Sequence, residues 1–347
     1  MGGGVIGLTT AFCLARAGVS VTLFDPALAR GATWASAGMI APTAEITAGE
    51  ELHFRQQRRA LAAWRELGDA MHQCIGERVD LHQTGSLLVG WDAGDRRYVE
   101  QFIQTASSFG ASVRRVLREE CPDLFVGVTP RISDGVMMPE DAWLDPDHVV
   151  VLLRRALHHL GVDVVEQEVV RVDDVDAGVV AWTSDQKYSA RHGIFATGAA
   201  RLPAGVRGAD ETAVRPVRGI TVRVRAADRG PAPMVRSWVR GRPFYYLSRP
   251  GGYGVLGATM DEHATTFVEV GELQRLLRDG RDLVPELEAA SFDEVRSGLR
   301  PATGDLAPFF IPLLPTAWAW SSGHYRHGVT LAPLAALRAL EFVRSGE

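Results

Sequence analysis

The first seven residues constrain the fold of this chain more than any other segment. They read Met-Gly-Gly-Gly-Val-Ile-Gly, so Gly2, Gly4 and Gly7 have the spacing of a G-x-G-x-x-G loop. In a dinucleotide-binding βαβ unit, these glycines make a tight turn, let the backbone approach a pyrophosphate and let the helix pack closely on the strand. The sequence then predicts a helix over residues 8–17 and a strand that ends at Asp25, where an acid can bind ribose hydroxyls. The segment therefore predicts a nucleotide-binding site.

The strand that normally precedes such a loop is missing from the sequence. Only Met1 stands before Gly2. That strand usually lies in the middle of a parallel sheet, so its loss would leave unpaired backbone groups and an exposed apolar slot. We therefore expect the natural protein to have several more residues upstream. The alternative is that another segment of the chain fills the slot.

The composition is that of a soluble globular enzyme. The chain has 347 residues, of which 46% are hydrophobic, and its formal net charge of −5 argues against a nucleic-acid partner. No apolar run has the length of a membrane span, and the N-terminus lacks the basic leading segment of a signal peptide, so we expect a cytoplasmic protein with no membrane partner. Cys13, Cys74 and Cys121 are too widely spaced for a disulfide framework or a zinc site, and no metal is expected.

Two kinds of pattern alternate along the chain and predict two interleaved domains. Small residues over 30–42 would let the backbone lie against a flat or phosphorylated group, and a buried strand over 193–196 runs into a second glycine turn. Between 214 and 260, period-two alternation predicts an antiparallel sheet with one exposed face. We therefore expect an α/β fold, α+β overall, in which a Rossmann-like domain without its first strand is interleaved with an antiparallel-sheet substrate domain.

Several further motifs occur in a fixed order along the chain. They are A-S-A-G-M-I-A-P at 35–42, A-T-G-A at 196–199, R-P-V-R-G at 215–219, G-A-T-M at 257–260, G-L-R-P at 298–301 and G-H-Y-R-H-G at 323–328. Together with the glycine loop, they resemble the D-amino acid oxidase family of flavoproteins from Gly2 to about residue 334. The first and the last of these motifs, in this order, are typical of the glycine oxidase branch of that family.

This resemblance implies non-covalently bound FAD and the oxidation of an amine. Glycine or another small amino acid would be converted to its imine while dioxygen is reduced to hydrogen peroxide, and the product would supply the thiazole moiety of thiamine. The FAD-binding domain would comprise residues 1–50, 145–212 and 297–347, and the substrate-binding domain residues 51–144 and 213–296. Relatives are often tetramers, so a homo-oligomer is also implied.

The resemblance assigns residues to the cofactor position by position. The residues implied to bind FAD are Gly2, Gly4, Val5, Ile6, Gly7, Asp25, Thr33, Ala35, Ser36, Ala37, Gly38, Met39, Val169, Thr197, Gly198, Gly323, His324, Tyr325, Arg326, His327, Gly328 and Val329. The glycine loop would flank the pyrophosphate, and Asp25 would bind the adenosine ribose. Residues 323–329 would offer backbone amides to the pyrimidine edge of the flavin and stabilise negative charge there.

Four residues are implied to act on the substrate. Arg300 would hold its carboxylate, because guanidinium geometry allows a bidentate pair. Tyr246 would hydrogen-bond the same carboxylate, Met260 would line the pocket, and Arg326 would lie near the reaction centre. On the residues alone, a surface position for Arg300 and core packing for Tyr246 and Met260 stay open. Positioning would supply most of the catalysis, so no histidine base is required.

Other interpretations depend on a few residues. A covalent flavin held by a cysteine in the C-terminal third is excluded, because no cysteine follows Cys121. A D-amino acid dehydrogenase with an acceptor other than dioxygen would carry the same motifs. A truncated or flavin-free form is a further alternative, raised by the missing strand, by Ile220, where relatives often have glutamine, and by the stretch 307–320, which lacks the usual glycine turn. Glycine, sarcosine and small D-amino acids stay alternative substrates.

Overall fold

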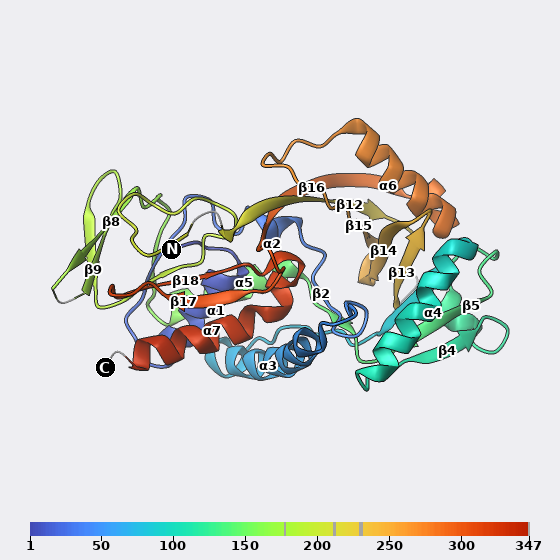
Figure 1. Ribbon diagram of the computed structural model, residues 1–347, viewed down its shortest axis with the longest axis horizontal. Helices are drawn as coiled ribbons and strands as arrows, with labels where there is room; N and C mark the ends of the chain where they lie inside the picture. The colour runs from blue at the N-terminus through green and yellow to red at the C-terminus, as the bar shows by residue number, and fades with distance from the viewer. Residues whose placement is uncertain (177, 211–212, 229–231, 346–347) are drawn as a thin grey trace.

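The computed structural model describes residues 1–176, 178–210, 213–228 and 232–345. They form an elongated molecule with two halves that meet near its middle (Figure 1). One half combines helices with small parallel sheets, and the other is built on one large sheet. Both chain termini lie in the first half.

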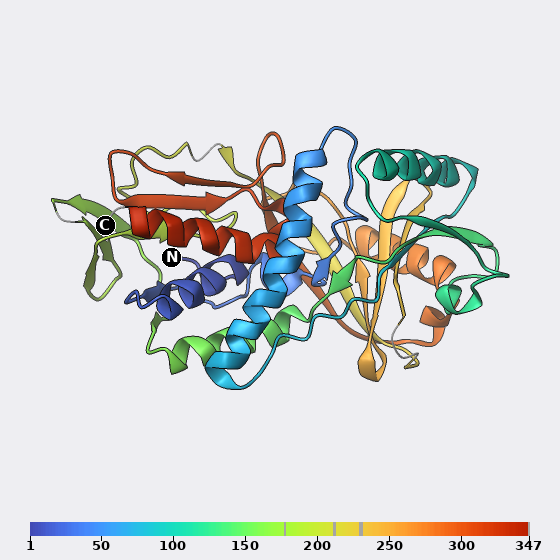
Figure 2. The same ribbon diagram turned by 90° about the horizontal axis from the view of Figure 1, so that it is seen from below.

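Four helices form the core of the first half. They are α1 (Val5–Arg16), α3 (Glu51–Ile75), α5 (Pro146–His159) and α7 (Gly328–Ser345). Their apolar faces share one hydrophobic cluster, in which the indole Nε1 of Trp64 donates a hydrogen bond to the Val329 carbonyl oxygen at 2.9 Å. Figure 2 shows α3 crossing the other helices of this half. The domain ranges expected from the sequence placed α3 in the substrate-binding domain, whereas α3 packs against the helices of this half. The division of the chain into two domains by residue range stays a prediction.

The strands of this half form several small sheets. β1 (Thr22–Phe24) pairs in parallel with β7 (Asp163–Val165), and β11 (Gly193–Phe195) pairs in parallel with β18 (Trp318–Ser322), which also pairs with β17 (Phe309–Pro312). The remaining elements are the sheet of β8 (Arg171–Val175), β9 (Gly178–Trp182) and β10 (Lys187–Ala190), the pair β2 (Met39–Ile40) and β6 (Ala142–Trp143), and the short helices α2 (Ala32–Ala35) and η5 (Tyr325–His327).

Met1 and Gly2 lie between β1 and β11, where the first strand of the motif was expected. Within the described chain, no other strand occupies this position. The Met1 ammonium group donates to the Ile194 carbonyl oxygen at 2.8 Å, and the Met1 carbonyl oxygen accepts from the Ala196 amide at 2.7 Å. On the other side, the Gly2 amide donates to the Phe24 carbonyl oxygen at 2.9 Å. Two residues thus connect the two parallel sheets and deliver the chain into the glycine loop.

The second half contains the antiparallel sheet that the alternating pattern predicts, extended to eight strands. Its order is β16 (Ser291–Ala302), β12 (Arg215–Arg225), β15 (Tyr253–Gly257), β14 (Arg242–Arg249), β13 (Met234–Val239), β3 (Ser86–Gly90), β5 (Asp134–Met138) and β4 (Arg114–Leu117). All neighbours are antiparallel except β13 and β3. The short helices η1 (Pro122–Phe125), η3 (Pro250–Gly252) and η4 (Pro285–Ala289) lie in its connections.

The two faces of this sheet are covered by different helices. Because side chains alternate along a strand, Leu87 and Leu88 on β3 enter different hydrophobic clusters. The Leu87 cluster includes Leu276 of α6 (Val270–Leu283), and the Leu88 cluster includes Phe102 of α4 (Ala93–Ser108). None of the helices in the described ranges combines the length and the apolar character needed to cross a bilayer.

Candidate active site

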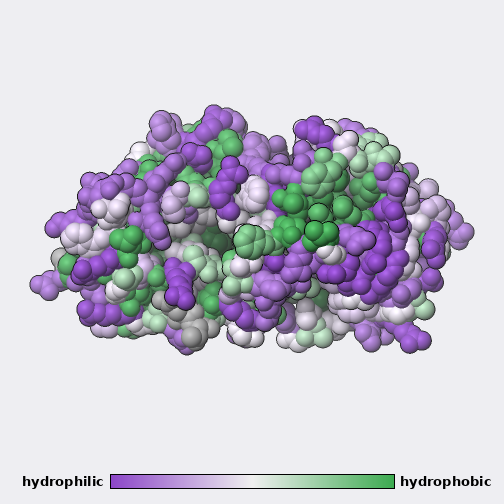
Figure 3. Space-filling view, turned by 90° about the horizontal axis from the view of Figure 1, so that it is seen from above, coloured by the Kyte–Doolittle hydropathy of each residue, from purple (hydrophilic) through white to green (hydrophobic). Residues whose placement is uncertain are grey.

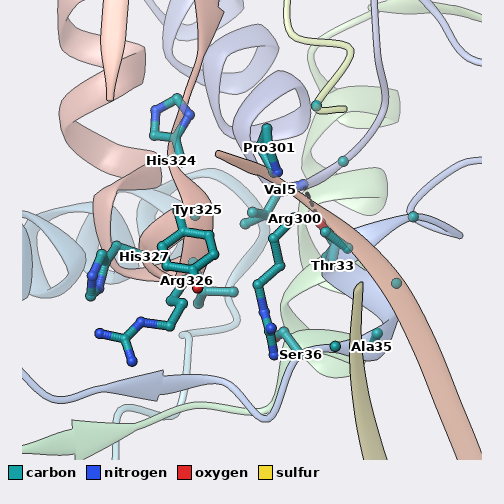
Figure 4. Close-up of a pocket in the computed structure, with 18 of the residues that line it drawn as sticks. Val5, Thr33, Ala35, Ser36, Arg300, Pro301, His324, Tyr325, Arg326 and His327 are labelled. Carbon is teal, nitrogen blue, oxygen red and sulfur yellow. Dashed lines mark hydrogen bonds between the residues drawn. The ribbon is translucent and has the colours of Figure 1, made fainter. Parts of the chain in front are cut away.

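A cavity of about 560 Å³ lies where the two halves meet. The surface is hollowed between the halves in the space-filling view of Figure 3. The cavity walls come from the glycine loop, the segment 32–39, the strands β12 and β16, and the segment 324–330. Figure 4 shows side chains from these segments around a common space.

The glycine loop leaves no room for side chains at two of its positions. Gly2 has a φ of 97°, and a Cβ there would collide with the Ala196 carbonyl oxygen. A Cβ on Gly7 would collide with the Gly2 carbonyl oxygen. Helix α1 begins directly after Gly4, so its first amides and the positive end of its dipole face the loop. This arrangement suits an anionic group such as a pyrophosphate.

Asp25 stands at the end of β1, beside this loop. Its Oδ2 atom accepts a hydrogen bond from the Gly3 amide at 2.5 Å, and its Oδ1 atom accepts one from the Ala27 amide at 2.7 Å. These bonds fix the carboxylate, and each oxygen keeps a second lone pair that can accept from a hydroxyl. Asp25 lines the cavity, as a ribose-binding acid would.

The segment 33–39 crosses the cavity, and Thr33 and the small residues 35–38 line it. Thr33 ties it to the glycine loop, since its Oγ1 accepts from the Val5 amide at 2.9 Å. Ser36 Oγ is buried and has no hydrogen-bond partner, and the same is true of Ser321 Oγ at the end of β18; both serines line the cavity. Buried hydroxyls usually have a hydrogen-bond partner, and a polar ligand in the cavity would supply one to these two.

The segment 323–329 closes the cavity from the side of α7. Gly323 turns with a φ of 75°, and Tyr325 has a φ of 45°, a left-handed conformation that costs a tyrosine roughly 1 kcal/mol or more. His324 and His327 are buried, and burial lowers their pKa values to about 4 and about 3 respectively. Both imidazoles are therefore neutral at neutral pH.

Arg300 projects from β16 into the cavity. It packs on Gly219 of β12, where a Cβ would collide with its guanidinium, and its Nη1 donates to the Thr259 carbonyl oxygen at 3.0 Å. Met260 lies nearby, with its sulfur 3.5 Å from the Tyr325 hydroxyl and 3.9 Å from Nη1 of Arg326. Arg300, Met260 and Arg326 therefore line one cavity, as expected from the sequence.

The structure places Tyr245, and not Tyr246, at this cavity. Tyr246 lies on the other face of β14, in the hydrophobic cluster with Val222 and Leu256. Tyr245 lines the cavity and packs on Gly257, where a Cβ would collide with the phenol ring. Burial raises the pKa of the Tyr245 hydroxyl, while the charge of Arg300 lowers it. The expected position was thus wrong by one residue, which on a strand means the opposite face.

Sequence reasoning gave no role to an ion-pair cluster on the same cavity. Glu45 accepts from Nη2 of Arg236 at 2.6 Å, and its second oxygen lies 2.9 Å from Nη2 of Arg326. Burial alone would raise the pKa of Glu45, yet the guanidinium groups of Arg236 and Arg326 bring it well below its usual range. Glu45 lies three residues after the end of the small-residue segment 30–42. The strand position of Arg236 carries no sequence signal.

Comparison with known proteins identifies the family of the chain that forms this cavity. A family model described as FAD dependent oxidoreductase matches residues 1–341. The chain belongs to this family of FAD-dependent oxidoreductases. A glycine oxidase of Bacillus licheniformis is 27% identical over 342 residues, which cover 96% of this chain and 89% of that protein. A bifunctional protein ThiO/ThiG of Trichormus variabilis is 26% identical over 350 residues, 99% of this chain and 52% of its own.

The fold agrees with that of solved members. The crystal structure of glycine oxidase from Geobacillus kaustophilus superposes with a TM-score of 0.88 at 24% identity, and the match covers 100% of this chain and 94% of the other. The FAD-dependent oxidoreductase fold, with its mixed α/β architecture and large sheet, is therefore confirmed.

The residues around the cavity of this FAD-dependent oxidoreductase suit the cofactor in their chemistry. The glycine loop and the start of α1 suit a pyrophosphate, Asp25 suits a ribose, and the hydroxyls of Ser36 and Ser321 lack partners. Of the residues expected to bind FAD, all line the cavity except Gly7 and Gly323, which shape the turns behind it. The individual contacts stay predictions.

Proposed function

We propose that this protein oxidises glycine or another small amino acid to its imine and reduces dioxygen to hydrogen peroxide. The observation that carries the proposal is the guanidinium of Arg300 in the cavity wall. A guanidinium in a confined site favours an anionic, planar partner that can form two parallel hydrogen bonds. The α-carboxylate common to all amino acids is such a partner.

The position of Arg300 and Tyr245 would set the orientation of the substrate. They project from β16 and β14 into the same space, close enough for each to affect the pKa of the other. A carboxylate held by the guanidinium could also accept from the tyrosine hydroxyl, and two points of attachment fix the direction of the α-carbon. Holding reacting atoms in the correct geometry is a large part of such a rate enhancement.

The chemistry balances without an acid or base from the histidines. The neutral amine loses a hydride from its α-carbon and a proton from its nitrogen, which leaves the imine; FAD, when bound, relays the electron pair, and dioxygen ends as hydrogen peroxide. The low pKa values of His324 and His327 keep both neutral at neutral pH. They therefore add no cation that would compete with Arg300 for the carboxylate.

The relatives named above support the choice of glycine within this class. We further propose that the product supplies the thiazole moiety of thiamine and that the protein acts in the cytoplasm as a homo-oligomer, for which a tetramer is one candidate form. The FAD-binding domain is proposed to comprise residues 1–50, 145–212 and 297–347, and the substrate-binding domain residues 51–144 and 213–296.

A peroxide assay tests the proposal. Purified protein with FAD is supplied under air with glycine, sarcosine or D-alanine, and with L-alanine as the comparison. Oxygen consumption matched by peroxide is the expected result for at least one of the first three amines. Reduction of an artificial electron acceptor without peroxide would indicate a dehydrogenase instead. No reaction with either acceptor would contradict the proposal.

A further inference from the structure

Four consecutive backbone carbonyl oxygens, those of residues 34–37, are held by side chains of the large sheet. Each accepts one hydrogen bond, at 3.0, 3.0, 3.0 and 2.8 Å in chain order: Trp34 from Arg296, Ala35 from Thr221, Ser36 from Arg223, and Ala37 from Arg249. The donors come from β12, β14 and β16. Three strands of one half of the molecule thus converge on one short segment of the other half.

The held segment lies between the arginines and the cavity. Residues 35–37 line the cavity, whereas Arg223, Arg249 and Arg296 are not among its lining residues. A trans peptide is planar, so its carbonyl oxygen and its N–H group point in opposite directions. Fixing the Ser36 and Ala37 oxygens on the side of the arginines therefore turns the attached Ala37 and Gly38 N–H groups away from them, whereas the Ser36 N–H, attached to the Ala35 carbonyl, donates to the Thr33 carbonyl oxygen at 3.2 Å.

Two of the three arginines have carboxylate partners, and the third does not. Arg296 pairs with Asp147 and Glu294, and Arg249 lies 3.2 Å from Asp145. For Arg223, no carboxylate in the described ranges lies within ion-pair distance, and burial, together with the charge of Arg249, lowers its pKa to about 10. Its Nη2 atom donates a hydrogen bond to the Ser36 carbonyl oxygen, while its Nε atom is buried without a hydrogen-bond partner.

A buried guanidinium without a carboxylate at ion-pair distance is costly, since desolvation opposes its charge, and at Arg223 the more distant Asp147 and Asp145 offset only part of this cost. The same charge raises the electrostatic potential of the cavity on the far side of the peptides. The segment 34–37 is thus fixed in position beside this charge.

We propose that Arg223, Arg249, Arg296 and Thr221 are positioning residues for the FAD-facing segment 34–37, and that Arg223 raises the reduction potential of the bound cofactor through it. The proposal rests on membership of the FAD-dependent oxidoreductase family and does not depend on which amine is oxidised. Removing the Arg223 charge should weaken the binding of FAD, and it should weaken the binding of the reduced form more than that of the oxidised form.

The test uses Arg223→Met, which keeps much of the side-chain length, and Arg223→Lys, which keeps the charge. FAD affinity is measured by titrating apoprotein, and the potential by equilibration with reference dyes. For Arg223→Met we expect roughly tenfold weaker affinity for oxidised FAD and a further roughly tenfold loss for the reduced form, equal to a potential lower by about 30 mV for a two-electron couple. Arg223→Lys should keep the potential and lose part of the affinity.

Arg225→Met is the matched control, because Arg225 is exposed at the end of the same strand and stacks on Tyr253. It should leave affinity and potential unchanged. Thr221→Val, which removes one hydrogen bond and no charge, should weaken affinity without moving the potential, and it remains informative if Arg223→Met does not fold. Arg223→Met with the affinity and potential of the parent protein would overturn the proposal, as would equal shifts in Arg225→Met.

Discussion

The two walls of the cavity differ in composition, since backbone forms most of one and side chains form the other. The cofactor wall, made of the glycine loop and of the backbone of the segments 33–39 and 323–329, depends for its shape on positions where no Cβ fits, and the Arg326 side chain belongs to the other wall. The substrate wall, made of Arg300, Tyr245, Met260, Arg326 and Glu45, is made of side chains, most of them on strands or linked by ion pairs. A change in the first wall should therefore affect cofactor binding, and a change in the second should affect the amine alone.

The largest expected effect is on the cofactor wall. Gly7→Ala places a methyl group on the Gly2 carbonyl oxygen, so the loop must shift. We expect FAD affinity to fall by roughly a hundredfold, about 2.7 kcal/mol, measured by titration of apoprotein. Gly304→Ala is the control, because a Cβ at Gly304 has no neighbour within 4 Å. Normal FAD affinity in Gly7→Ala would show that this close approach does not matter.

Arg300→Met should show the opposite pattern. Loss of a charge-assisted pair with the carboxylate should lower kcat/KM for the amino acid by roughly a hundredfold, while FAD affinity stays unchanged. Arg300→Lys should recover part of the loss, since it restores the charge without the planar fork. If FAD affinity fell as much as kcat/KM, the separation into two walls would be wrong.

Glu45→Gln tests the ion pairs that hold Arg326. Burial would raise the pKa of Glu45, but Arg236 and Arg326 lower it in the folded state below the ordinary 4.5. Its contribution to stability is therefore complete above about pH 5 and is lost as the pH falls toward the folded pKa. At pH 7 the free energy of unfolding of the variant should be lower than that of the parent protein by roughly 1–2 kcal/mol. Urea denaturation should show that this difference disappears below about pH 4. A difference that is independent of pH would contradict the assignment.

The smallest expected effect separates two neighbouring tyrosines. Tyr245→Phe should raise the KM for the amino acid by roughly tenfold at most, because one hydrogen bond of about 1 kcal/mol is lost. Tyr246→Phe should leave KM unchanged, since Tyr246 faces the hydrophobic cluster on the other side of β14. Steady-state kinetics on both variants are sufficient. A KM effect confined to Tyr246→Phe would place β14 in the opposite register.

The same contrast explains what could be predicted from the sequence. The cofactor wall uses local motifs, such as Gly2, Gly4 and Gly7 followed by Asp25, whose chemistry is tied to fixed spacing. The substrate wall depends on which face of a strand a residue occupies, and F-Y-Y-L at 244–247 does not distinguish Tyr245 from Tyr246. The antiparallel sheet followed from alternation, but its continuation through β3, β5 and β4 did not, because pairing between distant segments leaves no local signal.

The contacts of charged residues that are distant in the sequence could not be predicted either. Glu45 and Arg236 are far apart in the chain, as are Ser36 and Arg223, and only the packed fold brings each pair together. The position of Met1 and Gly2 between β1 and β11 could not be foreseen either, since the motif leads one to expect a full strand there.

Anaerobic mixing with amino acid tests the central claim most directly. The FAD-loaded protein and its Arg300→Met variant are mixed with glycine, sarcosine or D-alanine without oxygen, and the visible flavin absorbance is followed. We predict that at least one amine bleaches the flavin of the parent protein, that Arg300→Met requires far more of it, and that air restores the colour with an equivalent of peroxide. A flavin that binds normally and stays oxidised with every amine would contradict the account.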